Sequence, residues 1–143
     1  MMVKPALHSA ALLLLLLLSP GTLTADHDFA PIEVIVKSNL LSTPQLSFIT
    51  SVAPRGILLG ALNRLMNSNT DFKFTYREDP NYGPFLESVN GLAGSQEDHT
   101  YWEVFVQFPN NTIIATDVGI GCYIPKENEK IILNFTKWWR FSN

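Results

Sequence analysis

Residues 57–77 read ILLGALNRLMNSNTDFKFTYR and contain both of the periodicities on which the fold depends. From Ile57 to Met66 the apolar residues recur at helical spacing, and Asn67-Ser68-Asn69 ends the pattern. From Phe72 to Tyr76 every second residue is aromatic, which predicts a half-buried strand. We therefore expect a helix over residues 57–66 whose wide apolar stripe packs on a sheet.

Outside this segment the chain after residue 30 is predicted to be mostly strand. The other β-branched or alternating patterns cover residues 32–37, 45–52, 85–89, 101–108, 112–116 and 131–138. Asn90-Gly91, directly after one of these patterns, is a strong hairpin-turn signal. Together the patterns predict an α+β domain with an antiparallel-rich sheet and a single helix.

The first residues have the pattern of a secretory signal peptide. Lys4 is the only charged residue before Asp26, an apolar run from Ala10 to Leu18 follows, and Ser19-Pro20-Gly21 ends it. A membrane anchor is the alternative, but the run is about half of the ~20 residues that a spanning helix needs. We expect cleavage after Ala25, with Thr24 or Gly21 as alternative sites. Residues 1–25 are then the signal and 26–143 one secreted domain without a membrane span.

The charge balance gives no indication of a nucleic-acid or membrane-surface partner. The chain has 10 Lys+Arg and 13 Asp+Glu, a net charge of −3, and removing Lys4 with the signal makes it about −4. The basic residues are scattered, whereas nucleic-acid-binding proteins usually cluster them. We therefore expect neither nucleic acid nor anionic membrane as a partner.

Cys122 is the chain's single cysteine, so no internal disulfide can form. An unpaired thiol in a secreted protein indicates either a buried, small apolar residue or an intermolecular bridge. We expect the buried thiol first and keep a disulfide-linked dimer through Cys122 as the alternative.

Two Asn-x-Thr triplets mark acceptors for N-glycosylation on a secretory route. Asn110 begins Asn110-Asn111-Thr112 at a predicted turn, and Asn134 begins Asn134-Phe135-Thr136 within a predicted strand. We expect Asn110 to carry a glycan more often. Asn134 would have to point outward, opposite to Leu133 and Phe135.

No arrangement of residues indicates catalysis. His27 and His99 stand outside any zinc-ligand spacing, Cys122 has no adjacent His or Lys, and no Gly-x-Ser-x-Gly elbow occurs. We expect no enzyme and no structural metal site. One alternative remains: cleavage after Thr24 would expose Ala25-Asp26-His27, whose four nitrogens suit copper(II) or nickel(II).

Ordered segments of the second half resemble the C-terminal domain of the vitamin B12 carriers, which are intrinsic factor, transcobalamin and haptocorrin. The segments are YGPFLESVNGL at residues 82–92, TYWE at 100–103, DVG at 117–119, YIP at 123–125 and IILNFT at 131–136. The predicted helix and Phe72-Lys73-Phe74 fit in the same order. The resemblance covers essentially the whole chain after the signal.

The resemblance implies a cobalamin-facing surface. In the carriers, cobalamin is held between a large helical barrel and this small domain; here we expect the small domain alone. The residues that the resemblance places near a corrinoid are Tyr101, Trp102, Phe105, Gly119 and Tyr123. Trp102 and Phe105 could offer flat apolar contacts, although either ring could instead belong to the core.

We therefore predict a secreted, cobalamin-carrier-like domain that binds corrinoid weakly or together with a partner. That partner could be a helical-barrel protein or a receptor. The alternative is an extracellular protein-interaction module that keeps the fold and does not bind the vitamin.

Overall fold

The computed structural model describes residues 28–116 and 118–138, so the predicted signal peptide and His27 lie outside the described residues. The elements are β1 (Ala30–Ser38), β2 (Leu46–Val52), α2 (Leu58–Ser68), β3 (Phe74–Asp79), β4 (Gly83–Val89), β5 (Leu92–Ala93), β6 (Thr100–Gln107), β7 (Ile113–Ala115) and β8 (Lys130–Lys137). The α+β class, with one helix in the described residues, is confirmed.

Five strands form the main sheet in the order β2-β1-β8-β6-β7. β1 and β8 pair in parallel, whereas the other three pairs are antiparallel. The apolar residues of β8 suit this central position, because a strand with neighbours on both sides is shielded over most of its length. Ile131 to Thr136 are all buried.

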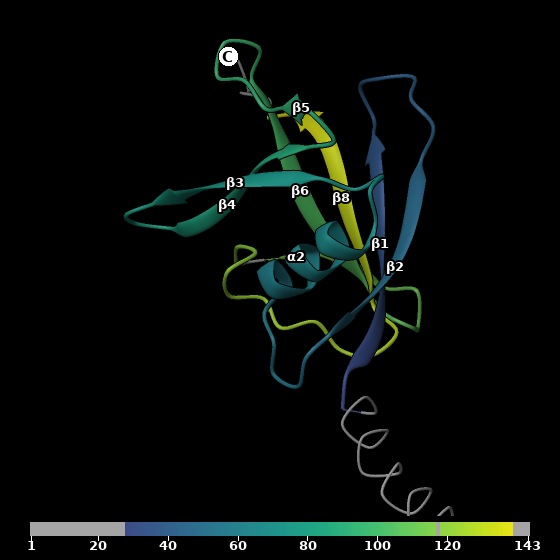
Figure 1. Cartoon of the computed structure of the whole chain (residues 1–143). Helices are drawn as coiled ribbons and strands as arrows, with labels where there is room; N and C mark the ends of the chain where they lie inside the picture. Colours follow the sequence, from purple (N-terminus) through teal and green to yellow (C-terminus); the bar gives the residue numbers. More distant parts are fainter. Residues whose placement is uncertain (1–27, 117, 139–143) are drawn as a thin grey trace, which may run out of the picture.

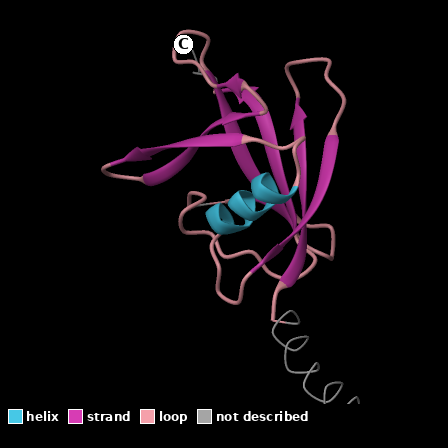
Figure 2. Cartoon of the chain, viewed as in Figure 1, coloured by secondary structure: helices cyan, strands magenta, loops and turns pink. Residues whose placement is uncertain are grey.

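α2 lies across one face of this sheet (Figures 1 and 2). Its spacing of apolar residues brings Leu58, Leu62 and Leu65 to one side, where all three are at most 1% exposed. They pack with Phe72 and with the inward residues of the sheet into one continuous core. The predicted packing of an apolar helix stripe on a sheet is therefore confirmed.

β3, β4 and β5 form a separate three-stranded sheet, and its β3–β4 hairpin extends away from the main sheet (Figure 1). The predicted Asn90-Gly91 turn joins β4 to β5, and both residues have positive φ, at 50° and 83°. This is the conformation that a two-residue hairpin turn requires.

The helix differs from its predicted bounds. It begins at Leu58 and continues through Asn67 to Ser68. The Ser68 hydroxyl donates a hydrogen bond to the Leu65 carbonyl, so this polar side chain has its partner within the last turn of the helix. Asn69 then leaves the helical conformation. At 11 residues, α2 is too short to cross a membrane, and the described residues contain no other helix.

Candidate ligand-binding site

A groove lies where the small sheet meets the free edge of β6. We call it the β4–β6 groove, and its volume is ≈ 360 Å³. It is lined by Phe85, Leu86, Tyr101, Trp102, Glu103, Val104, Phe105, Ala115, Thr116, Val118, Gly119 and Ile120. Three separate stretches of chain, from β4, from β6, and from the end of β7 with the connection that follows it, therefore build its walls.

The edge of β6 is free here because β7 is short. β7 pairs only with Phe105, Val106 and Gln107. The chain then turns away after Thr116, whose backbone N–H and hydroxyl both reach the Val104 carbonyl, at 3.2 and 3.3 Å. The part of β6 that precedes Val104 thus has no neighbouring strand on this edge, and the groove lies there instead.

The connection after β7 is held in place by the helix. The backbone N–H groups of Leu58 and Leu59 donate to the carbonyls of Tyr123 and Ile120, at 2.7 and 2.8 Å. A helix start leaves such N–H groups without partners inside the helix, and here Ile57 provides no side-chain cap. The first turn of α2 therefore fixes the groove wall that contains Gly119.

A second hollow of ≈ 420 Å³ adjoins the groove and shares Phe85, Leu86, Tyr101 and Trp102 with it. Its own wall includes Arg77 and Glu87, whose side chains form a salt bridge of 2.6 Å on neighbouring strands. The hydrogen bond from Arg77 lowers the pKa of the Glu87 carboxyl, and a hydrogen bond from Thr75 adds to this. The two hollows together form an aromatic-lined depression with a charged end.

Trp102 is mainly a core residue. It is 7% exposed, and its ring centroid lies 5.2 Å from that of Phe135. Its indole N–H donates to the Leu92 carbonyl at 2.8 Å, which ties β6 to β5 of the small sheet. Trp102 thus forms the floor of the groove and is largely covered.

Tyr101 points to the opposite face of β6 and is 37% exposed. Its hydroxyl donates to Glu103 at 3.1 Å, and the Asn134 amide donates to the other oxygen of Glu103 at 2.6 Å. Burial raises the pKa of the Tyr101 phenol, and the hydrogen bond to Glu103 adds to this. Asn134 Oδ1 is buried without a hydrogen-bond partner.

Phe105 and Gly119 also line the groove, Phe105 half-buried and Gly119 exposed. A Cβ at Gly119 would lie 3.0 Å from the Pro84 carbonyl oxygen. A side chain at this position would therefore press on the start of β4, so glycine allows the two walls to approach each other.

Tyr123 does not join the other predicted residues. Its side chain packs against the core, and its hydroxyl donates to the buried Glu129 carboxylate at 2.7 Å. Burial, followed by this hydrogen bond, raises the pKa of the Tyr123 phenol well above its usual value. Tyr123 therefore holds the groove wall in place from the side of the core and is not itself a lining residue.

Sequence reasoning missed two exposed apolar residues of the groove, Phe85 and Val118, at 42% and 45% exposure. Phe85 belongs to the segment that carries the family resemblance, and an aromatic residue facing outward on a strand was the available signal. Val118 also belongs to such a segment, DVG at 117–119, but a single valine between Asp117 and Gly119 has no periodicity that would indicate its exposure.

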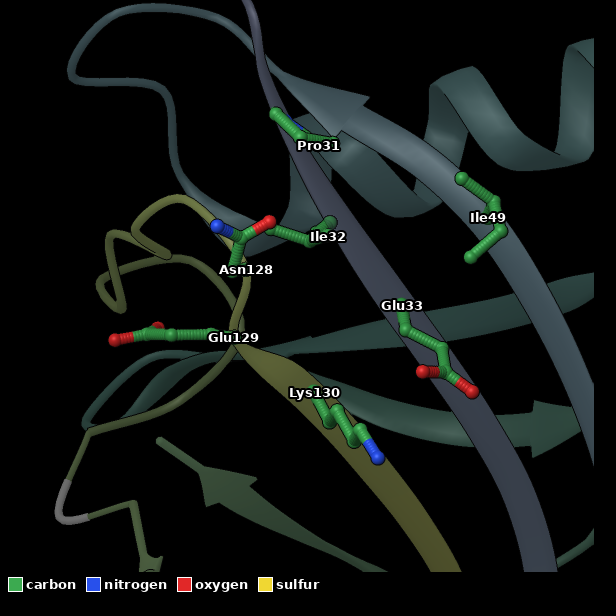
Figure 3. Close-up of a pocket in the computed structure, with 7 residues that line it drawn as sticks. All are labelled: Pro31, Ile32, Glu33, Ile49, Asn128, Glu129 and Lys130. Carbon is green, nitrogen blue, oxygen red and sulfur yellow. The ribbon is translucent and has the colours of Figure 1, made fainter. Parts of the chain in front are cut away.

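A smaller hollow of ≈ 160 Å³ lies at the start of β1 and β8 (Figure 3). It is lined by Pro31, Ile32, Glu33, Ile49, Asn128, Glu129 and Lys130. None of the predicted ligand residues is among them. No cluster of three or more His, Cys, Asp or Glu side chains that could hold a metal ion occurs within residues 28–116 and 118–138.

The modification sites differ in accessibility. Asn110 lies exposed in the β6–β7 turn, as predicted, and its side chain accepts a hydrogen bond from the Thr112 N–H at 3.0 Å. The Asn134 side chain points to the opposite face of the sheet from Leu133 and Phe135, but it is only 3% exposed, because β8 lies in the middle of the sheet.

Cys122 is exposed, so the expectation of a buried thiol is wrong. Its loop lies at the surface.

Residues 59–137 match the family model described as "Domain of unknown function (DUF4430)". The "Cobalamin binding intrinsic factor" proteins of Mus musculus and Canis lupus familiaris are 31% and 32% identical over 88 residues, 62% of this chain and 20% of each relative. The chain thus spans about a fifth of the length of these curated relatives.

Two solved structures share the fold. Haptocorrin in complex with Cbi aligns with a TM-score of 0.65 and 19% identity, over 78% of this chain and 26% of that chain. A candidate metal-binding protein from Ruminococcus gnavus ATCC 29149 aligns with a TM-score of 0.54 and 12% identity, over 77% of this chain and 99% of that chain. The resemblance to the cobalamin carriers that the sequence indicated is confirmed.

Proposed function

The chain belongs to the DUF4430 family, and from this membership and its likeness to cobalamin carriers we propose that it binds a corrinoid in the β4–β6 groove, weakly or together with a partner. One observation carries the proposal. Of the five residues that the family resemblance places near a corrinoid, Tyr101, Trp102, Phe105 and Gly119 line the same groove.

The chemistry of the groove suits one face of a corrin. The macrocycle is a broad, largely apolar ring fringed with amide groups. Phe85, Tyr101 and Phe105 offer aromatic surface to such a ring, and aromatic contacts contribute beyond the area they bury. Glu103, the Tyr101 hydroxyl and the nearby Arg77–Glu87 pair offer polar contacts for the amides.

The same geometry supports weak binding. Ligand sites usually enclose most of a small molecule, whereas this groove of ≈ 360 Å³ is open on one side. The translational and rotational cost of binding is nearly the same for a half site as for a complete one, so missing contacts remove most of the net affinity. A helical protein that covers the other face of the corrin would supply them.

A secreted location forms part of the proposal. It is supported by the signal-like sequence of residues 1–25 and by the likeness to the intrinsic factors. The Cys122 thiol is exposed and has no cysteine within this chain to pair with, so it is available for a disulfide-linked dimer.

The proposal is tested by titrating cobalamin into the purified domain, residues 26–143, and recording tryptophan fluorescence and corrin absorbance. We expect saturable binding with a dissociation constant of micromolar or weaker, about −8 kcal/mol or less favourable. If millimolar cobalamin changes neither signal, the domain alone is not a corrinoid binder. The protein-interaction module, favoured by the exposed apolar side chains of Phe85 and Val118, then becomes the better interpretation.

A glycosylation test addresses the secretory route. Expressed in mammalian cells, the wild-type chain is expected to lose mass on glycosidase treatment, and Asn110→Gln is expected to remove that loss because Asn110 is exposed. Asn134→Gln is expected to leave the glycan mass unchanged, since Asn134 is 3% exposed and donates to Glu103. A mass loss that persists undiminished in Asn110→Gln would contradict this assignment.

A further inference from the structure

β2 is an edge strand whose outer edge has no partner strand within the described residues. Its seven residues, LSFITSV, contain no charged residue and no proline. Proteins usually protect such edges with charges, prolines or bulges, because an open row of backbone groups pairs readily with another strand. β2 has none of these protections.

The contrast with the other edges is clear. β3, the edge of the small sheet, contains Arg77, Glu78 and Asp79, and the register between β3 and β4 shifts after Thr75. β7, at the opposite edge of the main sheet, has only three residues. The structure thus protects or shortens these two edges. The part of β6 beyond β7 lines the β4–β6 groove and contains Glu103, whereas the longer β2 is open and uncharged.

The sequence of β2 is complementary to itself. If two copies pair in antiparallel fashion about Ile49, Ser47 of each copy lies opposite Ser51 of the other, and Phe48 lies opposite Thr50. Ile49, which is 71% exposed, then meets its own counterpart on the outer face of the sheet. Such two-fold pairing brings the same surface of both copies together, as in most symmetric dimers.

Two charged side chains lie close to β2 within the same chain. Arg64 lies at the Ser51 end of β2, where its guanidinium stacks 4.4 Å from the Phe29 ring centroid. At the other end, the Ser47 hydroxyl donates to the Glu33 carboxylate. Figure 3 shows Glu33 and Ile49 on the neighbouring strands β1 and β2. Glu33 is the cross-strand partner of Ile49 on β1, so its charge lies one strand behind the free edge and leaves the edge of β2 itself uncharged.

We propose that β2 is a homodimerisation edge, through which two copies of this chain join their sheets in a two-fold antiparallel pair about Ile49. This surface is separate from the β4–β6 groove, which remains open in the dimer. It is also independent of Cys122, which lies in the loop after β7.

The experiment measures the mass of the secreted chain by sedimentation equilibrium, with reductant present to exclude a Cys122 bridge. Over about 1 to 100 µM, a range that brackets micromolar affinity, we expect the wild type to approach twice the monomer mass. Ile49→Lys and Ile49→Glu are each expected to remain monomeric, because like charges would oppose each other across the two-fold axis. Mixing these two variants is expected to restore the dimer, since opposite charges then meet.

Ile113→Lys on β7 is the matched control, because Ile113 is an exposed apolar residue on the opposite edge of the same sheet. It is expected to dimerise like the wild type. A wild type that stays monomeric throughout would overturn the proposal, and so would Ile49 variants that still dimerise individually. Failure of the mixture to dimerise would also overturn it, since circular dichroism of each variant establishes separately that it is folded.

Discussion

Trp102→Ala is expected to lower the free energy of unfolding by about 3–5 kcal/mol, the range for removing a large buried aromatic side chain. Trp102 is 7% exposed, packs on Phe135 and donates its indole N–H to the Leu92 carbonyl. The substitution thus opens a cavity and removes one hydrogen bond between the two sheets. Equilibrium unfolding in urea, followed by circular dichroism, measures the change.

Two variants separate the parts of this effect. Trp102→Phe keeps most of the ring packing but loses the donor to Leu92, so it is expected to be intermediate between wild type and Trp102→Ala. Tyr101→Ala, at the preceding position and on the exposed side of β6, is expected to lower the free energy of unfolding by about 1 kcal/mol or less. Equal losses for Trp102→Ala and Tyr101→Ala would contradict the core role of Trp102.

β6 illustrates what an alternating pattern leaves undecided. Tyr101 and Trp102 are neighbours, so a strand must send them to opposite faces. Because both faces carry aromatic residues, the sequence alone does not indicate which side is the core. The structure decides this by packing: Trp102 meets Phe135 on the helix-covered side, while Tyr101 bonds to Glu103 on the other.

Local signals predicted local structure well. The Asn90-Gly91 turn and the apolar face of α2 both depend on residues that are close in sequence. The parallel pairing of β1 with β8 was not predicted. It joins strands that are far apart in sequence, and the pattern of neither strand indicates which other strand it pairs with. The separate β3-β4-β5 sheet was missed for a different reason: the local signals indicate hairpins between neighbouring strands but do not indicate whether these strands join the main sheet.

The candidate site was predicted in part. The family resemblance indicated Tyr101, Phe105 and Gly119, which all line the β4–β6 groove. Phe85 and Val118 were missed, because the groove exists only where β4 and the connection after β7 approach β6. That approach depends on the N–H groups at the start of α2, which hold the Ile120 and Tyr123 carbonyls. Tertiary hydrogen bonds of this kind leave no pattern in the sequence.

The double variant Phe85→Ala/Tyr101→Ala is expected to weaken corrinoid binding about tenfold or more. Both rings are exposed and line the groove, at 42% and 37% exposure. An aromatic contact contributes about 0.5–1.5 kcal/mol beyond the area it buries. Two lost contacts therefore amount to about 1–3 kcal/mol, and the apolar area that is no longer buried adds to this, so the sum reaches the 1.4 kcal/mol of a tenfold change in the dissociation constant. Titration monitored in the corrin absorbance measures the shift.

Tyr76→Ala is the matched control, since Tyr76 is an equally exposed aromatic residue, at 41%, on the same hairpin as Phe85 but outside the groove lining. It is expected to bind like the wild type. Tyr101→Phe, which keeps the ring and loses the hydrogen bond to Glu103, separates aromatic contact from hydrogen bonding. Because Phe85 and Tyr101 are exposed, the double variant is expected to lose less stability than Trp102→Ala and to stay folded, so lost binding reports on contact with the ligand. Unchanged affinity in a folded double variant would place the corrinoid elsewhere on the domain, while equal weakening by Tyr76→Ala would point to the outer face of the hairpin.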